Sequence, residues 1–159
     1  KSCHYIRDSR RSSNDSTRST QMRLTLPMVS RLQPKSIQGP KEIEELLDRS
    51  LDWDFDIFAL EVLSNQKPLV NLGMNLMCRY NVPARLNCEE KILQNWLTVI
   101  EYKYHRSNSY HNSTHAADVL QATARFMQSD RLQMILEPLD EVAALIAAAA
   151  HDIDHPGKS

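Results

Sequence analysis

The spacing of apolar residues predicts helices along most of the chain after residue 40. Apolar side chains recur three and four residues apart, as on a helix with one buried face. The predicted helices cover residues 41–49, 68–80, 88–104 and 113–127, followed by a short one over 130–136 and a last one from Pro138 to Ala150. No run alternates between apolar and polar residues over a useful length. The pattern therefore predicts an all-α fold.

Residues that start and stop helices divide this pattern. Asn81-Val82-Pro83 ends the second predicted helix, and Asn87 is expected to cap the third. Tyr110-His111-Asn112 falls at a junction between a polar loop and a helix that starts at Ser113 or Thr114. The last helix, residues 138–150, is apolar on nearly every face, which favours a central position surrounded by other helices.

Composition divides the chain into two parts. Residues 1–36 carry eight basic and two acidic side chains among many Ser and Thr, whereas residues 37–159 carry eleven basic and eighteen acidic ones. The first part has too few apolar residues to offset the entropy of ordering it. We interpret residues 1–36 as a disordered Ser/Arg-rich linker and residues 37–159 as one folded region.

The linker offers one candidate modification site. Arg10-Arg11-Ser12-Ser13 places two guanidinium groups before a hydroxyl, so we expect a basophilic kinase as a partner at Ser13. The scattered arginines have no aromatic residues between them, which argues against a nucleic-acid or anionic-membrane surface.

The cysteines and the apolar runs suggest a compartment. The three cysteines, Cys3, Cys78 and Cys88, have neither metal-site nor disulfide-framework spacing, which predicts reduced thiols in a cytoplasmic protein. No apolar run is long enough to predict a transmembrane segment, and no signal peptide is evident.

Histidines and an aspartate form two tight clusters. His111 and His115 are four residues apart and would share a face if both lay on one helix. His151 and His155 repeat the spacing, and Asp152 follows the first of them. Imidazole and carboxylate together suit a divalent ion such as zinc, with manganese or magnesium as alternatives. Each histidine alone could be a structural residue, but the two clusters together predict metal-assisted hydrolysis.

The motifs resemble those of the class I cyclic nucleotide phosphodiesterases over roughly residues 37–159. The matching segments are Trp53–Phe58, Tyr110–Val119 and His151–Gly157. Tyr110–His115 and Asp140–Ala147 look most like the type-8 high-affinity cAMP-specific subfamily. The resemblance implies a multi-helical HD-type catalytic domain that hydrolyses 3',5'-cyclic nucleotide, with cAMP expected, to the 5'-monophosphate in cyclic-nucleotide signalling.

The resemblance also implies roles for matched residues. His115, His151 and Asp152 would bind Zn²⁺, and Asp152 would bridge to a second ion, Mg²⁺ or Mn²⁺. His155 would hydrogen-bond the water activated there. His111 would be the general acid that protonates the departing 3' oxygen, and Tyr110 would line the substrate pocket.

The family pattern continues beyond Gly157, so the chain is expected to hold only the N-terminal helices of the catalytic domain. The remaining metal ligand and the residues that recognise the base would then lie elsewhere, and the isolated chain is expected to be inactive. Two hypotheses remain open. The chain is part of a longer phosphodiesterase, with a homodimer as its expected assembly, or it is a non-catalytic fragment that associates with or regulates the full-length enzyme.

Overall fold

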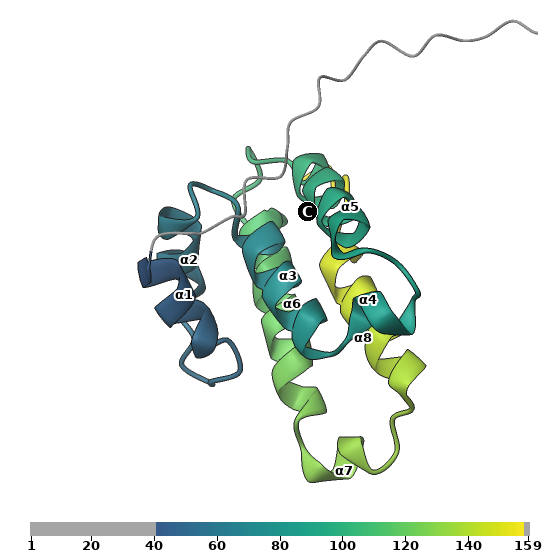
Figure 1. Ribbon diagram of the computed structural model, residues 1–159. Helices are drawn as coiled ribbons and strands as arrows, with labels where there is room; N and C mark the ends of the chain where they lie inside the picture. Colours follow the sequence, from purple (N-terminus) through teal and green to yellow (C-terminus); the bar gives the residue numbers. More distant parts are fainter. Residues whose placement is uncertain (1–40, 158–159) are drawn as a thin grey trace, which may run out of the picture. The chain divides into compact units, whose positions relative to one another are not determined.

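The computed structural model describes residues 41–157, which fold into helices joined by short loops (Figure 1). The helices are α1 Lys41–Asp48, α2 Ile57–Leu63, α3 Pro68–Arg79, α4 Val82–Arg85, α5 Glu90–Lys103, α6 Ser113–Met127, α7 Asp130–Gln133 and α8 Pro138–Ala150. No strand occurs in this described part, which confirms the all-α prediction. The predicted linker over residues 1–36, including Ser13, lies outside the described residues.

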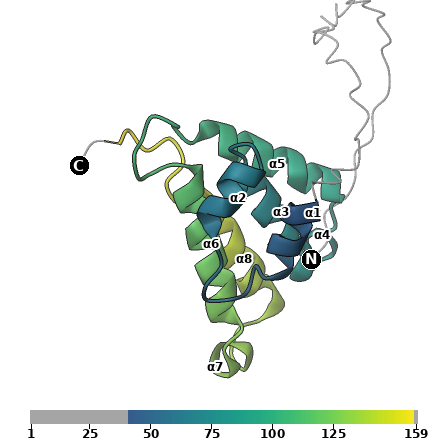
Figure 2. The same ribbon diagram turned by 90° about the vertical axis from the view of Figure 1, so that its left-hand side faces the viewer.

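Helices α3, α5, α6 and α8 surround the core. Figure 2 shows α6 and α8 side by side, and α7 lies in the connection from the end of α6 to the start of α8. The fully buried side chains include Leu72 and Leu76 of α3, Leu97 of α5, Leu120 of α6 and Leu145 of α8. The resulting bundle holds the start of α6 beside the end of α8.

A glycine lets α3 and α5 approach closely. A Cβ atom built on Gly73 would lie 2.8 Å from a methyl carbon of Leu97, nearer than side-chain carbons normally come. The small residue therefore lets Leu97 pack directly on the α3 backbone. This contact helps to place α5, whose C-terminal end leads into the histidine-bearing loop.

Two local predictions need correction. Asn87 does not cap α5, because it adopts a left-handed conformation (φ 50°) in the turn after α4, and the helix begins later, at Glu90. Asparagine tolerates this conformation better than most residues, so the same residue type serves either as a cap or as a turn. The short helix predicted over residues 130–136 is only the four-residue α7.

Helix α8 is less enclosed than its composition suggests. Val142, Leu145 and Ala149 are buried, but Leu139 is 64% exposed and Ala143 is also exposed. Within the described residues, α8 therefore buries one face against α6 and its neighbours and leaves another open. A fully surrounded position for α8 stays a prediction, because the chain is expected to hold only part of the catalytic domain.

Candidate metal centre

The first donor, His115, is placed by the cap of α6. The Asn112 side-chain oxygen accepts hydrogen bonds from the backbone N–H groups of Thr114 (3.0 Å) and His115 (3.1 Å). This local cap satisfies two amides that have no partner inside the helix. It fixes the start of α6 so that His115 lies in its first turn, with its side chain only 15% exposed.

The other two donors lie where α8 ends. His151 is the residue after the last helical position, and Asp152 follows it in a turn. The His151 Nδ1 atom is 2.9 Å from the Ala148 carbonyl oxygen. Since a carbonyl can only accept, Nδ1 carries the proton and the Nε2 lone pair is left free. The backbone thus sets the tautomer that a metal ligand at Nε2 requires.

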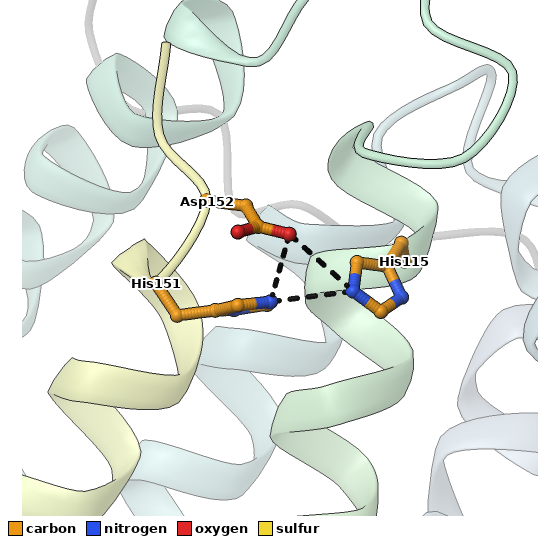
Figure 3. A group of neighbouring side chains, drawn as sticks. All are labelled: His115, His151 and Asp152. Atoms are coloured by element: carbon orange, nitrogen blue, oxygen red, sulfur yellow. Dashed lines mark hydrogen bonds and ion pairs between the residues drawn. The ribbon is translucent and has the colours of Figure 1, made fainter. Parts of the chain in front are cut away.

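Figure 3 shows the three side chains pointing toward one another. The His115 and His151 Nε2 atoms are 3.2 Å apart, and the Asp152 Oδ2 atom lies 3.5 Å from the first and 3.1 Å from the second. Ligands about 2.0–2.1 Å from a tetrahedral ion are separated by about 3.3–3.4 Å. The triangle therefore fits one face of a tetrahedral zinc site.

Electrostatics favours the neutral, metal-binding form of His115. Burial lowers its pKa, the neighbouring His151 and His111 imidazoles lower it further, and Asp152 opposes these effects. In the part of the chain that the structure describes, His115, His151 and Asp152 form the group of His, Cys, Asp and Glu donors close enough to share a cation.

The remaining two histidines stack on each other. The His111 and His155 ring centroids are 3.8 Å apart, with the planes inclined by 21°. The Asn108 side-chain amide donates to the backbone carbonyl oxygens of both residues, at 3.0 Å and 2.8 Å. The His111 Nε2 atom lies 4.0 Å from Asp152 Oδ2, so the stacked rings lie beside the donor triangle.

Tyr110 lies beside His115, at one corner of the triangle. Its ring centroid is 4.3 Å from that of His115, and 61% of its surface is exposed. Together they line a pocket of about 350 Å³ that also contacts Phe58 and Asp118. The pocket is open to solvent, and His115 is the one of the three donors that lines it.

The structure thus brings together His111, His115, His151, Asp152 and His155, with Tyr110 beside them. Neither histidine pair shares a helix face, because each pair spans a helix end, in line with the predicted helix start at Ser113 or Thr114. Sequence reasoning also missed Asn108 and Tyr104, which contact the histidine loops. Asn108 falls between the predicted helices over residues 88–104 and 113–127, and Tyr104 ends the first of them, so neither stands out by its pattern.

Comparison with known proteins decides the family. Residues 110–159, which include Asp152 and the four histidines of the site, match the family described as 3'5'-cyclic nucleotide phosphodiesterase. The chain is also 48% identical over 157 residues to a Drosophila melanogaster protein named high affinity cAMP-specific and IBMX-insensitive 3',5'-cyclic phosphodiesterase 8. The chain belongs to the cyclic nucleotide phosphodiesterase family. The resemblance seen in the motifs, including that to the type-8 subfamily, is confirmed.

Further phosphodiesterases show the same similarity. A Homo sapiens phosphodiesterase 8A is 49% identical over 120 residues, which is 76% of this chain. A probable 3',5'-cyclic phosphodiesterase of Caenorhabditis elegans is 43% identical over 117 residues, or 74% of the chain. The Drosophila match covers 97% of this chain but 17% of its relative, and the human and nematode matches cover 14% and 15% of theirs. The chain therefore spans about one sixth of the length of these phosphodiesterases.

The helices were also compared with the requirements of a membrane span. None of those in residues 41–157 combines the length and apolar character needed to cross a bilayer.

Proposed function

We propose that this chain supplies the metal-binding histidines and the general acid of an enzyme that hydrolyses 3',5'-cyclic AMP to 5'-AMP. The observation that carries the proposal is the triangle of His115, His151 and Asp152 donors, with His111 4.0 Å from the carboxylate. The choice of cAMP rests on the names of the relatives, which describe them as cAMP-specific.

In the proposed site, His115, His151 and Asp152 would hold Zn²⁺. Asp152 would also help to hold a second ion, Mg²⁺ or Mn²⁺. When bound, such a pair of ions neutralises the phosphodiester and acidifies water for attack on phosphorus. The half-buried position of Asp152, whose side chain is 20% exposed, keeps water from competing for the carboxylate.

His111 is the proposed general acid. As the P–O3' bond breaks, the 3' oxygen takes a proton from the imidazolium, and the cyclic ester opens to a 5'-monophosphate. The His155 ring stacks on the His111 ring and restricts its rotation. This arrangement keeps the acid beside the ligands without making it one of them.

Tyr110 is the proposed wall of the substrate pocket. Its exposed ring packs beside His115, and both side chains line the pocket, where a nucleotide bound to the metals would contact Tyr110. Phosphorylation of Ser13, homodimer formation and a cytoplasmic location remain predictions.

The test uses the longer protein that contains this chain, assayed for conversion of cAMP to 5'-AMP by chromatography with Zn²⁺ and Mg²⁺ present. His111→Asn should lower kcat by about 10²–10⁴ while leaving the zinc content unchanged, because it removes only proton donation. Asp152→Ala should remove both zinc and activity. His105→Asn is the control, because His105 is exposed and its Nε2 atom pairs with Asp154, outside the donor triangle.

Two results would contradict the assignments. A His111→Asn enzyme with unchanged kcat would refute the general acid, and an Asp152→Ala enzyme with full zinc content would refute the ligand.

A second candidate function is association with a full-length phosphodiesterase. The observation that favours it is a row of exposed apolar side chains on α5, with Ile92 57%, Val99 57% and Tyr102 85% exposed. The 159-residue chain should be assayed alone and then mixed with the longer enzyme. Activity in the isolated chain would refute the expectation that it is inactive, whereas a change in the activity of the longer enzyme on mixing would support the regulatory role.

A further inference from the structure

Tyr104 places a buried hydroxyl under the turn that carries the metal ligands. It follows the last residue of α5, and its side chain lies in the core with only 3% of the residue exposed. The hydroxyl donates to the Ala149 carbonyl oxygen (3.1 Å) and accepts from the Asp152 backbone N–H (3.3 Å). One atom thus joins the last turn of α8 to the aspartate that follows it.

These contacts replace the bonds that would continue α8. In an uninterrupted helix, the Asp152 N–H would donate to the Ala148 carbonyl, and residue 153 would donate to Ala149. Here the Ala148 carbonyl accepts from the His151 ring, the Ala149 carbonyl accepts from Tyr104, and Ile153 N–H turns back to Ala150. The helix therefore stops where side chains occupy its last carbonyl groups.

The turn after α8 places the Asp152 carboxylate. His151 keeps helical backbone angles (φ −60°, ψ −32°), but the Asp152 N–H donates to the Tyr104 hydroxyl and not to the Ala148 carbonyl. In this turn, the Asp152 Oδ2 atom lies 3.1 Å from His151 Nε2 and 3.5 Å from His115 Nε2. The Tyr104 hydroxyl holds the Asp152 amide in this arrangement.

We propose that Tyr104 is a positioning residue of the metal centre: its hydroxyl ends α8 and orients Asp152 toward His115 and His151. The inference rests on the metal site proposed above, and it assigns Tyr104 no contact with metal or substrate.

The molecule contains a matched control in Tyr80. This tyrosine follows the last residue of α3, is 7% exposed, and donates from its hydroxyl to the Ala124 carbonyl near the end of α6. Its hydroxyl also accepts from the Gln128 side chain. Burial raises the pKa of both tyrosine hydroxyls, so both remain protonated donors at neutral pH. The two residues share a local architecture, but Tyr80 contacts no proposed ligand.

The experiment compares Tyr104→Phe with Tyr80→Phe in the full 159-residue chain. Each substitution removes one buried hydroxyl and keeps the ring, so both should lower the unfolding midpoint in urea. Co²⁺ is titrated into each metal-free chain while its visible absorption bands are recorded. Tyr104→Phe should weaken Co²⁺ binding by about 10–100-fold, the effect usual for groups that orient metal ligands, and alter the band pattern. Tyr80→Phe should bind Co²⁺ as the unmodified chain does.

Each outcome decides a separate question. Equal Co²⁺ affinity in Tyr104→Phe and the unmodified chain would overturn this inference and leave the metal centre standing. An unmodified chain without Co²⁺ binding would overturn the metal centre itself, and the role of Tyr104 with it. If Tyr104→Phe does not fold, hydrogen exchange in the unmodified chain decides: the Asp152 amide should exchange slowly without metal, and rapid exchange would refute the hydrogen bond on which the inference depends.

Discussion

The two His-x-x-x-His pairs have the same spacing but lie at opposite kinds of helix end. His111 precedes α6 and His115 lies in its first turn, whereas His151 follows α8 and His155 lies in the loop beyond it. The close contacts run between the pairs and not within them. His115 meets His151 at the donor triangle, and His111 stacks on His155.

The difference between these two contacts indicates two kinds of role. The His115–His151 contact brings together two ring nitrogens and a carboxylate oxygen, the geometry of a ligand set. The His111–His155 contact is face to face, at 3.8 Å, and is held by the Asn108 amide through backbone carbonyls. We therefore expect substitutions in the first contact to remove metal, and substitutions in the second to change the orientation of the acid.

The largest expected effect is on Co²⁺ affinity, and it distinguishes the His115–His151 contact from the His111–His155 contact. His115→Ala should lower the Co²⁺ affinity of the chain by more than about 100-fold, because a ligand matters more than the groups around it. His155→Ala should change it by less than about tenfold. Isothermal titration calorimetry on both variants measures the difference. Similar losses in the two variants would show that His155 belongs to the ligand set.

A second test contrasts Asp152 with a carboxylate that has no imidazole neighbour. Glu101 of α5 is buried, and its Oε1 atom accepts from the Leu69 backbone N–H at the start of α3 (2.8 Å). Burial raises its pKa from 4.5 to about 7, although hydrogen bonds from Leu69 and Val70 lower it. Backbone amides thus partly stabilise this carboxylate, whereas Asp152 lies among three histidines.

The sign of the pH effect follows from the raised pKa. Between pH 4.5 and about 7 the folded chain binds more protons at Glu101 than the unfolded chain, so its stability falls as pH rises through this window. The loss should reach up to about 3 kcal/mol, and Glu101→Gln should remove it. Urea denaturation at pH 5 and pH 8 measures the free energy of unfolding of the unmodified chain and of Glu101→Gln. The same pH dependence in these two chains would show that Glu101 ionises normally.

A smaller effect is expected where Gly157 meets Asn108. Gly157 has φ +71°, and a Cβ atom there would lie 2.2 Å from the Asn108 side-chain oxygen. Gly157→Ala should therefore destabilise the chain by about 1–3 kcal/mol and disturb the stacked pair while leaving the donor triangle in place. Thermal unfolding measures the stability, and the NMR shifts of the His111 and His155 ring protons measure the stacking.

A double variant shows whether the Gly157→Ala effect passes through Asn108. Asn108→Ala combined with Gly157→Ala should cost less than the sum of the two single variants, because the steric clash with Asn108 disappears. Additive costs would mean that the effect comes from the backbone conformation alone.

The smallest expected effect concerns the exposed pair beside the histidine loops. The His105 Nε2 atom lies 2.9 Å from Asp154 Oδ1, and both side chains are largely open to solvent. Exposed ion pairs contribute little, so His105→Ala should change the unfolding free energy by less than about 1 kcal/mol and leave Co²⁺ affinity unchanged. A large loss of Co²⁺ affinity would show that His105 also supports the metal loop.

The helix pattern was predictable where local rules act alone. Apolar spacing located α3, α5 and α6, and the start of α6 at Ser113 matches one of the two predicted positions. Prediction failed at Asn87, since asparagine suits both a cap and a left-handed turn. The contacts between the two histidine pairs were not predictable either, because a four-residue spacing indicates a shared face only when the helix extends across both residues.

The sequence by itself determined the all-helical class, the chemical identity of the donors and the family to which they belong, because these depend on residue types and their order. Only the tertiary structure decided which histidine meets which, because those contacts join residues 36 and 44 positions apart through the packing of α6 against α8. The side chains that hold the histidine loops in place also depend on the tertiary structure. The Tyr104 hydroxyl and the Asn108 amide reach their partners 45 to 48 residues away, distances over which no local pattern carries information.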